Sequence, residues 1–326
     1  METDMLQRRT LLISTAALAA GAAPWVRAQS FPERAIHWIV PYAPGGTGDQ
    51  VARLVSAAPT MKINGQSVIV DNRPGAGTII GTQTIAAARA DGYTIGQIDP
   101  QFAINASLRP ELSYRQADFT YIAGIGTLPM ALALRADFPG KTLKEVLDHI
   151  RTSGDKLSYG TWGVGSINHL AGEDLSERLG APCVAAAYPG SAPIAQALIG
   201  KQIDFTFLDM PTLAPFAEAG RLRIVAMTSP SRMPSMPDVP ALAEFFPGFE
   251  YLTFLGIAGP KGIPPERVKA VSEALLSTVG QADIRKNLEQ RGITPWGVGP
   301  EELQAFVHKQ SDLFRSIIQK RNIRVN

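Results

Sequence analysis

The sequence predicts an α/β protein with two domains, and three observations lead to this expectation. Short apolar runs alternate with segments of helical spacing, which is typical of strands and helices that follow one another along the chain. The 326 residues are enough for two domains with full cores. Glycine-rich turns join several of the apolar runs to the helical segments that follow.

The expected elements follow from these patterns in chain order. Strands are expected at residues 36–40, 68–70, 94–98, 121–125, 131–134, 157–159, 205–208, 224–227 and 254–258. Helices are expected at residues 51–57, 78–88, 143–151, 167–179, 191–199, 211–219, 264–279 and 300–321. Helix starts are indicated by Thr142 with Glu145 and by Pro264, and helix ends by Gly180, Gly200, Gly220 and Gly292.

The chain is expected to cross between the two domains twice. The extended stretch around Gly124, Gly126 and Pro129 is the first crossing, and the stretch at 249–260 is the second. The first domain would comprise residues 29–126 and 253–326, and the second domain residues 127–252. A chain that leaves one α/β domain, builds another and returns makes a hinged clamshell.

Residues 1–28 have the composition of a signal peptide. Arg8 and Arg9 precede the uncharged apolar stretch 11–23, and a small-residue cleavage site ends at Ala28. The paired arginines favour a twin-arginine signal, and an ordinary secretory signal is the alternative. The mature protein is therefore expected in the periplasm, and no later segment is long and apolar enough to span a membrane.

Composition excludes several classes of function. A net charge of +2 without a basic tract argues against nucleic-acid binding. Cys183 is the only cysteine, so an internal disulfide and a cysteine metal site are excluded, and a buried structural thiol is expected. The four histidines have no metal-like spacing, and the motifs of common hydrolases and of phosphate-binding loops are absent. No cofactor or metal is expected.

The segment PYAPGGTGD at 41–49 is the first candidate binding loop. It joins a strand to a helix, so backbone N–H groups at Gly45, Gly46 and Thr47 would form a cradle for an anion. The loop has no lysine, which favours a carboxylate over a polyphosphate. Asp49 is expected to cap the helix or fix the loop. A plain glycine-rich connector is the alternative. For the similar segment 71–77, an ordinary turn is favoured.

The segment YGTWGVGSINH at 159–169 is the second candidate loop. Gly163, Gly165 and Ser166 again lie between a strand and a helix, with Ser166 placed as a cap or a ligand donor. Trp162 would either stack on a ligand or pack in the core. His169 is expected to be a packing residue, because no partner carboxylate is evident from local spacing.

Further candidates lie at other expected strand ends. Tyr188, Gly190 and Ser191 belong to another glycine connection before a helix, YPGSAP. Asp99 and Asp209 are each expected to be either a turn or cap residue or an acceptor for a hydroxyl or ammonium group of a ligand.

Taken together, these motifs resemble those of one family. The order APGGTGD, DNRPGAG, DGYT, YGTWGVGSINHLAGE and YPGSAP is similar to that of the Bug-type receptors, the extracytoplasmic substrate-binding proteins of tripartite tricarboxylate transporters. The resemblance covers essentially the whole mature chain. It implies a two-domain Venus-flytrap fold and a carboxylate held by backbone N–H groups and waters at converging helix N-termini. The positions that match the family's site are Gly45, Gly46, Thr47, Asp49, Gly163, Gly165, Ser166, His169, Tyr188, Gly190, Ser191 and Asp209.

Four departures from the family pattern bear on the ligand. Asp99 stands where the family often has a hydroxyl residue, Trp162 where it has a small residue and Val164 where it often has asparagine. The lysine usual before Gly190 is also missing. The expected pocket is therefore more apolar and less cationic than one for citrate.

The resulting expectation is a monomeric, non-enzymatic receptor for a small monocarboxylate with an apolar or aromatic body, held by the two loops. It would dock transiently on membrane transporter subunits. Three alternatives remain open: a zwitterionic ligand whose ammonium meets Asp99, a ligand sensor that docks on a receptor kinase, and an enzyme using Ser166 with His169.

Overall fold

A computed structural model describes residues 31–109, 111–188 and 190–325. Its elements run in the order β1 (Ile36–Val40), α2 (Thr47–Ala57), β2 (Val68–Asn72), α3 (Ile79–Ala86), β3 (Thr94–Ile98), α4 (Pro100–Leu108), β4 (Phe119–Arg135), α5 (Leu143–Ser153), β5 (Ser158–Thr161), α6 (Ile167–Leu179), β6 (Val184–Ala187), α7 (Ser191–Ile199), β7 (Phe205–Asp209), α8 (Met210–Glu218), β8 (Leu222–Met227), β9 (Leu252–Pro260), α9 (Pro265–Gly280), α10 (Ala282–Gln290), β10 (Thr294–Val298) and α11 (Pro300–Lys320). The signal-peptide prediction falls on residues 1–28, outside the described residues.

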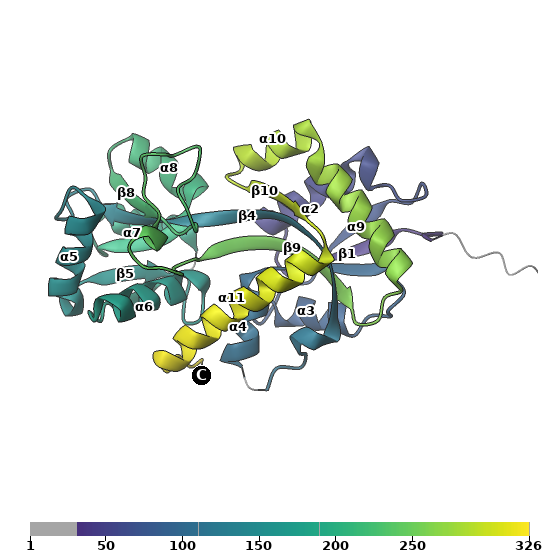
Figure 1. The fold of residues 1–326 in the computed structure, drawn as a ribbon, viewed down its shortest axis with the longest axis horizontal. Coiled ribbons are helices and arrows are strands. Elements are labelled where there is room, and N and C mark those ends of the chain that lie inside the picture. Colours follow the sequence, from purple (N-terminus) through teal and green to yellow (C-terminus); the bar gives the residue numbers. More distant parts are fainter. Residues whose placement is uncertain (1–30, 110, 189, 326) are drawn as a thin grey trace, which may run out of the picture.

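The protein has two lobes with a shared middle (Figure 1). The first lobe contains β1, β2, β3 and β10 with helices α2, α3, α9 and α10, and the second lobe contains β5 to β8 with helices α5 to α8. Strands β4 and β9 run between the lobes, and the long helix α11 crosses from one to the other. This α/β architecture confirms the fold class expected from the sequence.

The strands form one curled sheet in the order β2-β1-β3-β9-β4-β7-β5-β6, and β10 and β8 also pair with β4. The pairings fix the strand directions. Strands β1 and β3 are parallel, and β9 lies antiparallel between β3 and β4, so β1 and β3 point the same way as β4, toward the second lobe. Strands β5, β6 and β7 run opposite to β4, toward the first lobe. The carboxyl ends of both strand sets therefore meet at the junction, where ligands of open α/β sheets bind.

Strand β4 is longer than the sequence analysis expected. Two strands were expected around Gly124, Gly126 and Pro129, but the structure has one strand of 17 residues. The glycines make room for side chains of β10 and of the residue just before it instead of ending β4. A Cβ on Gly124 would lie 2.7 Å from the Trp296 ring, and one on Gly126 would lie 2.4 Å from Ile293.

Strand β4 changes neighbours at one point. Up to Pro129, it pairs with β9, and from Met130 onward it pairs with β7.

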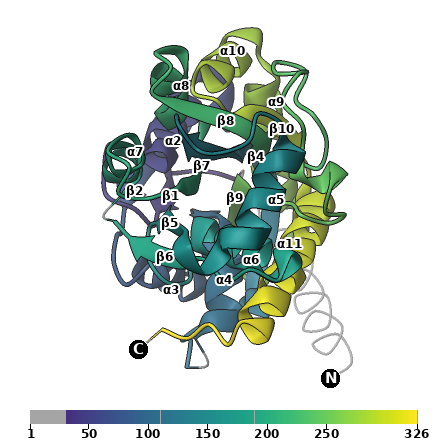
Figure 2. The same ribbon diagram turned by 90° about the vertical axis from the view of Figure 1, so that its left-hand side faces the viewer.

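Helix α11 contributes to the cores of both lobes. Leu303 and Val307, near its start, pack with Phe254 in a first-lobe cluster. Phe314, Ile317 and Ile318, near its end, join the second-lobe cluster that contains Leu170 and Leu175 of α6. Figures 1 and 2 both show α11 running along α4 and α6. The division at 126/127 and 252/253 remains a prediction, and α11 belongs to both packing units.

Several elements were not expected from the sequence. Helix α4 lies between the lobes and buries side chains around most of its circumference, including Phe102, Ala103, Ile104 and Leu108, so it lacks an amphipathic period. Strand β6 is a largely exposed edge strand of small residues. Cys183, which precedes it, is free and buried as expected. Strand β10 was also missed, and α10 separates from α9 at Gln281, whose backbone is extended.

Two statements hold for the described ranges 31–109, 111–188 and 190–325. No helix in them is long and apolar enough to cross a membrane. They also contain no group of three or more histidine, cysteine, aspartate or glutamate side chains placed to hold a metal ion.

Candidate functional site

The first candidate loop connects β1 to α2. Helix α2 begins after Gly46, and Gly45 has a φ of +90°, a backbone conformation that favours glycine. The first N–H groups of any α-helix lack intrahelical partners, so Thr47 and Gly48 present theirs at the junction of the lobes. The expected helix N-terminus behind a glycine turn is therefore present, and its use as a cradle for an anion stays a prediction.

Asp49 fixes this loop from within. Its Oδ2 accepts hydrogen bonds from Gly45 N at 2.8 Å and Arg53 Nε at 3.0 Å. Its Oδ1 lies 2.9 Å from Arg53 Nη2 and accepts from Asn72 Nδ2 at 3.0 Å. The hydrogen bond from Arg53 is the main reason why the pKa of Asp49 is lowered to about 2. Because Arg53 balances its charge, Asp49 does not leave an unpaired anion beside the helix N-terminus.

Asp99 acts as the N-cap of α4. Its Oδ1 accepts from Gln101 N at 2.8 Å, and its Oδ2 accepts a hydrogen bond from the hydroxyl of Tyr42, in the first loop. Burial raises the pKa of Asp99, and burial together with the neighbouring Asp99 raises the pKa of Tyr42. Asp99 thus joins the β1–α2 and β3–α4 connections, and Tyr42 as a whole residue is 37% exposed.

Gln97, on β3, lies against the same helix start. A Cβ on Gly48 would lie only 2.4 Å from Gln97 Nε2, so a larger residue there would require the Gln97 side chain to move. The carboxamide is buried and has no hydrogen-bond partner within the described part of the chain. This contact could not be predicted from the sequence, because it depends on how β3 and α2 pack.

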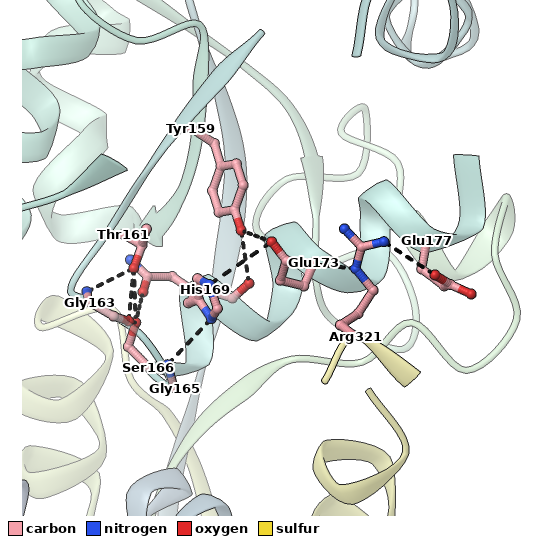
Figure 3. A network of polar contacts seen from close by, with 10 residues as sticks. Tyr159, Thr161, Gly163, Gly165, Ser166, His169, Glu173, Glu177 and Arg321 are labelled. Carbon is pink, nitrogen blue, oxygen red and sulfur yellow. Dashed lines mark hydrogen bonds and ion pairs between the residues drawn. The ribbon is translucent and has the colours of Figure 1, made fainter. Parts of the chain in front are cut away.

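The second candidate loop connects β5 to α6, and its own polar groups shape it (Figure 3). Ser166 Oγ donates to Gly163 O at 2.6 Å and contacts Asn168 Oδ1 at 2.7 Å. Thr161 Oγ1 accepts from Gly163 N at 2.8 Å and lies 3.2 Å from Ser166 Oγ. Trp162 N donates to Asn168 Oδ1 at 3.2 Å. The hydroxyl of Ser166 therefore holds the loop closed on itself.

His169 extends this network into α6. Its Nδ1 accepts a hydrogen bond from Gly165 N at 3.3 Å, and its Nε2 lies 4.0 Å from Glu173 Oε1. Glu173 Oε1 also accepts from Tyr159 Oη at 2.8 Å, and its Oε2 accepts from Arg321 Nε at 2.7 Å. Burial lowers the pKa of His169 and outweighs the opposite effect of Glu173.

The expectation that no carboxylate would partner His169 by local spacing was wrong. Glu173 follows at i+4, one helical turn later, and this spacing was the available signal. Arg321 was missed for a different reason, since its approach to α6 depends on the path of α11.

The remaining expected residues lie at the starts of α7 and α8. Trp162 Nε1 donates to Ser191 Oγ at 3.2 Å, and the half-buried Trp162 ring packs against both second-lobe clusters. Helix α7 begins after Gly190, whose φ is +131°, and Tyr188 N bonds to Thr161 O at 2.9 Å. Asp209 caps α8 by accepting from Thr212 N at 3.1 Å. The capping alternative for Asp99 and Asp209 is what the structure shows.

The starts of α2, α4, α6, α7 and α8 thus all follow strands whose carboxyl ends face the junction. The sequence itself identifies the family. Residues 51–323 match the sequence profile of the tripartite tricarboxylate transporter family receptor, TctC. This chain belongs to that receptor family.

Relatives of this receptor are similar over nearly their full length. A protein encoded between tcbD and tcbE in Pseudomonas sp. strain P51 is 31% identical over 98% of this chain and 96% of its own. Among solved structures, the periplasmic binding protein BugD is 32% identical with a TM-score of 0.73, covering 90% of this chain and 99% of that one.

Two further solved structures contain carboxylates. Rpa4515 of R. palustris with adipate is 29% identical with a TM-score of 0.76, covering 90% of this chain and 99% of that one. MatC of Rhodopseudomonas palustris with bound malate is 28% identical with a TM-score of 0.72, covering 88% and 100%. The receptor therefore has the two-domain fold of periplasmic binding proteins, is of the Bug type and serves a tripartite tricarboxylate-type transporter.

Two cavities of the receptor lie away from the expected ligand loops. One of about 530 Å³ is lined by Phe119, Tyr121 and Ile263, and another of about 540 Å³ by Met233, Trp296 and Phe306. The expected ligand residues line neither of these two. The candidate site is thus defined by the converging helix starts, and its residue assignments remain predictions.

Proposed function

We propose that the receptor binds a monocarboxylate with an apolar or aromatic body at the junction of the lobes. The backbone N–H groups at the starts of α2 and α6 would hold the carboxylate. Tyr42 and Trp162 would contact the body of the ligand. This proposal narrows the family's role as a solute receptor to one class of solute.

The observation that carries this proposal is the combination of charge and exposure at the two loops. The charge of Arg53 is paired with Asp49, and His169, whose pKa is lowered, is neutral at pH 7. The apolar surface at the same loops is open, since Tyr42 is 37% exposed and Val164 is 56% exposed. Neutral N–H donors beside exposed apolar side chains suit one carboxylate on an apolar body.

The proposal extends to the cell biology of the receptor. The leader 1–28 would be removed, and the mature protein would act in the periplasm as a monomer that docks transiently on its membrane subunits. The lobes would move as the domains 29–126 with 253–326 and 127–252, hinged where β4 and β9 cross. Periplasmic relatives support the location, and light scattering on the mature protein measures the oligomeric state.

A ligand panel tests the proposed class. Thermal unfolding is measured with benzoate, phenylacetate, adipate, malate and citrate at matched ionic strength, because a ligand that binds the folded state raises the melting temperature by mass action. At 100 times its Kd, a ligand adds about 2.7 kcal/mol to the free energy of unfolding. The aromatic monocarboxylates are expected to give the largest shifts. Shifts from adipate and malate alone would show that this receptor takes dicarboxylates, as in the two relatives.

A proline substitution tests the backbone donors directly. Thr47 is the first residue of α2 and follows an extended residue, so Thr47→Pro is compatible with the helix but removes one N–H. Losing a hydrogen bond to a charged group costs about 1.5–3 kcal/mol, or roughly a 10- to 100-fold rise in Kd. Ala282→Pro is the matched control, because Ala282 is the first residue of α10 after extended Gln281. Equal affinities of both variants for the selected ligand would exclude the α2 cradle.

A further inference from the structure

The second-lobe loop 163–166 is connected to the end of α11 through three side chains (Figure 3). Two of them, His169 and Glu173, are on α6, and the third, Arg321, directly follows α11. We propose that His169, Glu173 and Arg321 form a positioning relay that holds residues 163–166 in their binding shape only while the imidazole is neutral, so that protonation of His169 weakens ligand binding. The relay rests on the proposed function in one respect: the loop 163–166 must contribute to the ligand site.

The first step of the relay is the hydrogen bond from Gly165 N to His169 Nδ1. Gly165 has a φ of +79°, a conformation that favours glycine, and its backbone lies close to Leu108: a Cβ there would lie 2.1 Å from Leu108 Cδ2. The imidazole accepts this bond only when Nδ1 carries no proton. Protonation would set two N–H groups against each other, and the loop would have to change its conformation.

The second step fixes the orientation of the imidazole. With Nδ1 as acceptor, the ring proton is on Nε2, which faces Glu173 Oε1 at 4.0 Å. Glu173 is itself held by the hydroxyl of Tyr159 and by Arg321. The carboxylate of Glu173 is therefore held by side chains from two other elements, β5 and the end of α11. It presents an acceptor oxygen in a fixed position to the imidazole ring.

The groups around His169 set the direction of its titration. Glu173 on α6 favours the imidazolium, whereas burial and Arg321 oppose it, and the net effect is a lowered pKa. The ring of Tyr159 on β5 stacks on the imidazole with centroids 6.4 Å apart. Farther out, Glu177 pairs with Arg321 at 3.5 Å, and the buried thiol of Cys183, whose pKa is raised, stays uncharged.

The sign of the effect follows from these facts. At neutral pH, His169 is uncharged and the bond from Gly165 is intact. As the pH falls through the lowered pKa of His169, the bond is lost and affinity for an anion is expected to decrease. Simple attraction between an imidazolium and a carboxylate would give the opposite trend, so the direction of the pH dependence distinguishes the two.

The third step joins the relay to the first lobe. Arg321 directly follows α11, whose beginning packs in the first-lobe core through Leu303 and Val307. The second-lobe loop is therefore held partly by a helix that starts in the other lobe. Arg321 does not belong to the loop. If its substitution changes the titration of His169 and of the Gly165 amide, the effect must pass through the relay.

The first test uses the receptor without any ligand. The amide shift of Gly165 and the ring-nitrogen shifts of His169 are followed by NMR from about pH 8 to about pH 4.5, a range that spans the ordinary histidine pKa of about 6.5. The two sets of shifts are expected to titrate together, with a midpoint below 6.5. In Arg321→Met, the midpoint should rise, because a cation that opposes protonation is removed. An unresponsive Gly165 amide, or a midpoint above the ordinary value, would overturn the relay.

The second test measures Kd against pH with benzoate, or with malate if the panel selects malate. Wild type is expected to lose affinity by up to about tenfold per pH unit below the pKa of His169. His169→Asn keeps an acceptor near the Nδ1 position and does not titrate. At every pH, this variant should bind the ligand as tightly as wild type does at about pH 8. It should therefore lack the acid limb, which is the fall in affinity at low pH. His169→Met, without an acceptor, should bind weakly at every pH.

Matched controls separate the relay from general acid effects. Arg315→Met removes another arginine near the end of α11, one that pairs with Asp312 and is half-exposed, and it should leave the pH profile unchanged. His149→Asn removes a histidine that packs on Phe138 of the second lobe, and the acid limb should persist. An acid limb that remains in His169→Asn would refute the relay even if the proposed ligand class is correct. A normal NMR titration with no response to any monocarboxylate would instead refute the ligand class alone.

Discussion

At the scale of single residues, the polar side chains of the candidate site bond to their own loops and to neighbouring segments. Asp49 holds Gly45 and Arg53, Asp99 holds Tyr42, and Ser166 holds Gly163. Each loop keeps its shape through these bonds, while the first N–H groups of the helices remain directed at the junction. The side chains therefore shape the loops, and ligand binding by the N–H groups of the helix starts remains a prediction.

Asp99 offers a prediction at this scale. Replacing an N-cap by alanine costs about 0.5–2 kcal/mol, whereas asparagine is as good a cap as aspartate. Asp99→Ala is therefore expected to lower the free energy of unfolding by about 1 kcal/mol, and Asp99→Asn to change it little. Urea denaturation at neutral pH measures both.

The same pair of variants tests the zwitterion alternative. Both carboxylate oxygens of Asp99 are occupied within the protein, by Gln101 and by Tyr42. Asp99→Asn should therefore keep whatever preference the receptor has between amino acids and plain acids. A selective loss of amino-acid binding in this variant would instead place Asp99 in contact with a ligand ammonium group.

At the scale of elements, hydrophobic periodicity predicted the strands and helices whose limits are set by the local sequence. The strands at 36–40 and 94–98 and the helices at 167–179 and 191–199 have the bounds expected from the sequence, because apolar runs and glycine turns delimit them. Helix α4 was missed because it is buried on most sides, and β6 because its side chains are small and exposed. Four of the five helix starts of the site, those of α2, α6, α7 and α8, could be predicted in kind, but Gln97, Arg321 and the Tyr42–Asp99 bond depend on tertiary packing.

Strand β4 gives a prediction at the scale of elements. In Gly124→Ala, the new methyl group would lie 2.7 Å from both the ring of Trp296 and Val298, so overpacking is expected to cost about 1–3 kcal/mol. Gly280→Ala is the matched control at the end of α9, where a Cβ meets nothing within 4 Å. Alanine there should be neutral or stabilise the protein by up to about 1 kcal/mol. Chemical denaturation of the two variants checks this, and equal costs would contradict the packing argument.

At the scale of the whole molecule, the lobes share too much structure to unfold separately. Strand β4 pairs in both halves of the sheet, and α4 and α11 place side chains in the core clusters of both lobes. Losing either lobe would expose apolar surface of the other, which is costly.

The receptor is therefore expected to unfold in a single thermal transition without ligand. Scanning calorimetry checks this, since the calorimetric and van't Hoff enthalpies should agree for a two-state process. Two resolved transitions, or a calorimetric enthalpy well above the van't Hoff value, would show that the lobes are independent folding units.

The position of β9 has a consequence for how the chain is made. Strand β9 lies between β3 and β4, yet it is synthesised more than a hundred residues after β3. Until it emerges from the ribosome, β3 and β4 each present an unpaired edge to other chains. The first lobe, although it begins the chain, can close its sheet only after the second lobe has been made. A nascent chain is therefore most exposed to aggregation in the interval before residue 252, and a chaperone that covers strand edges would act then.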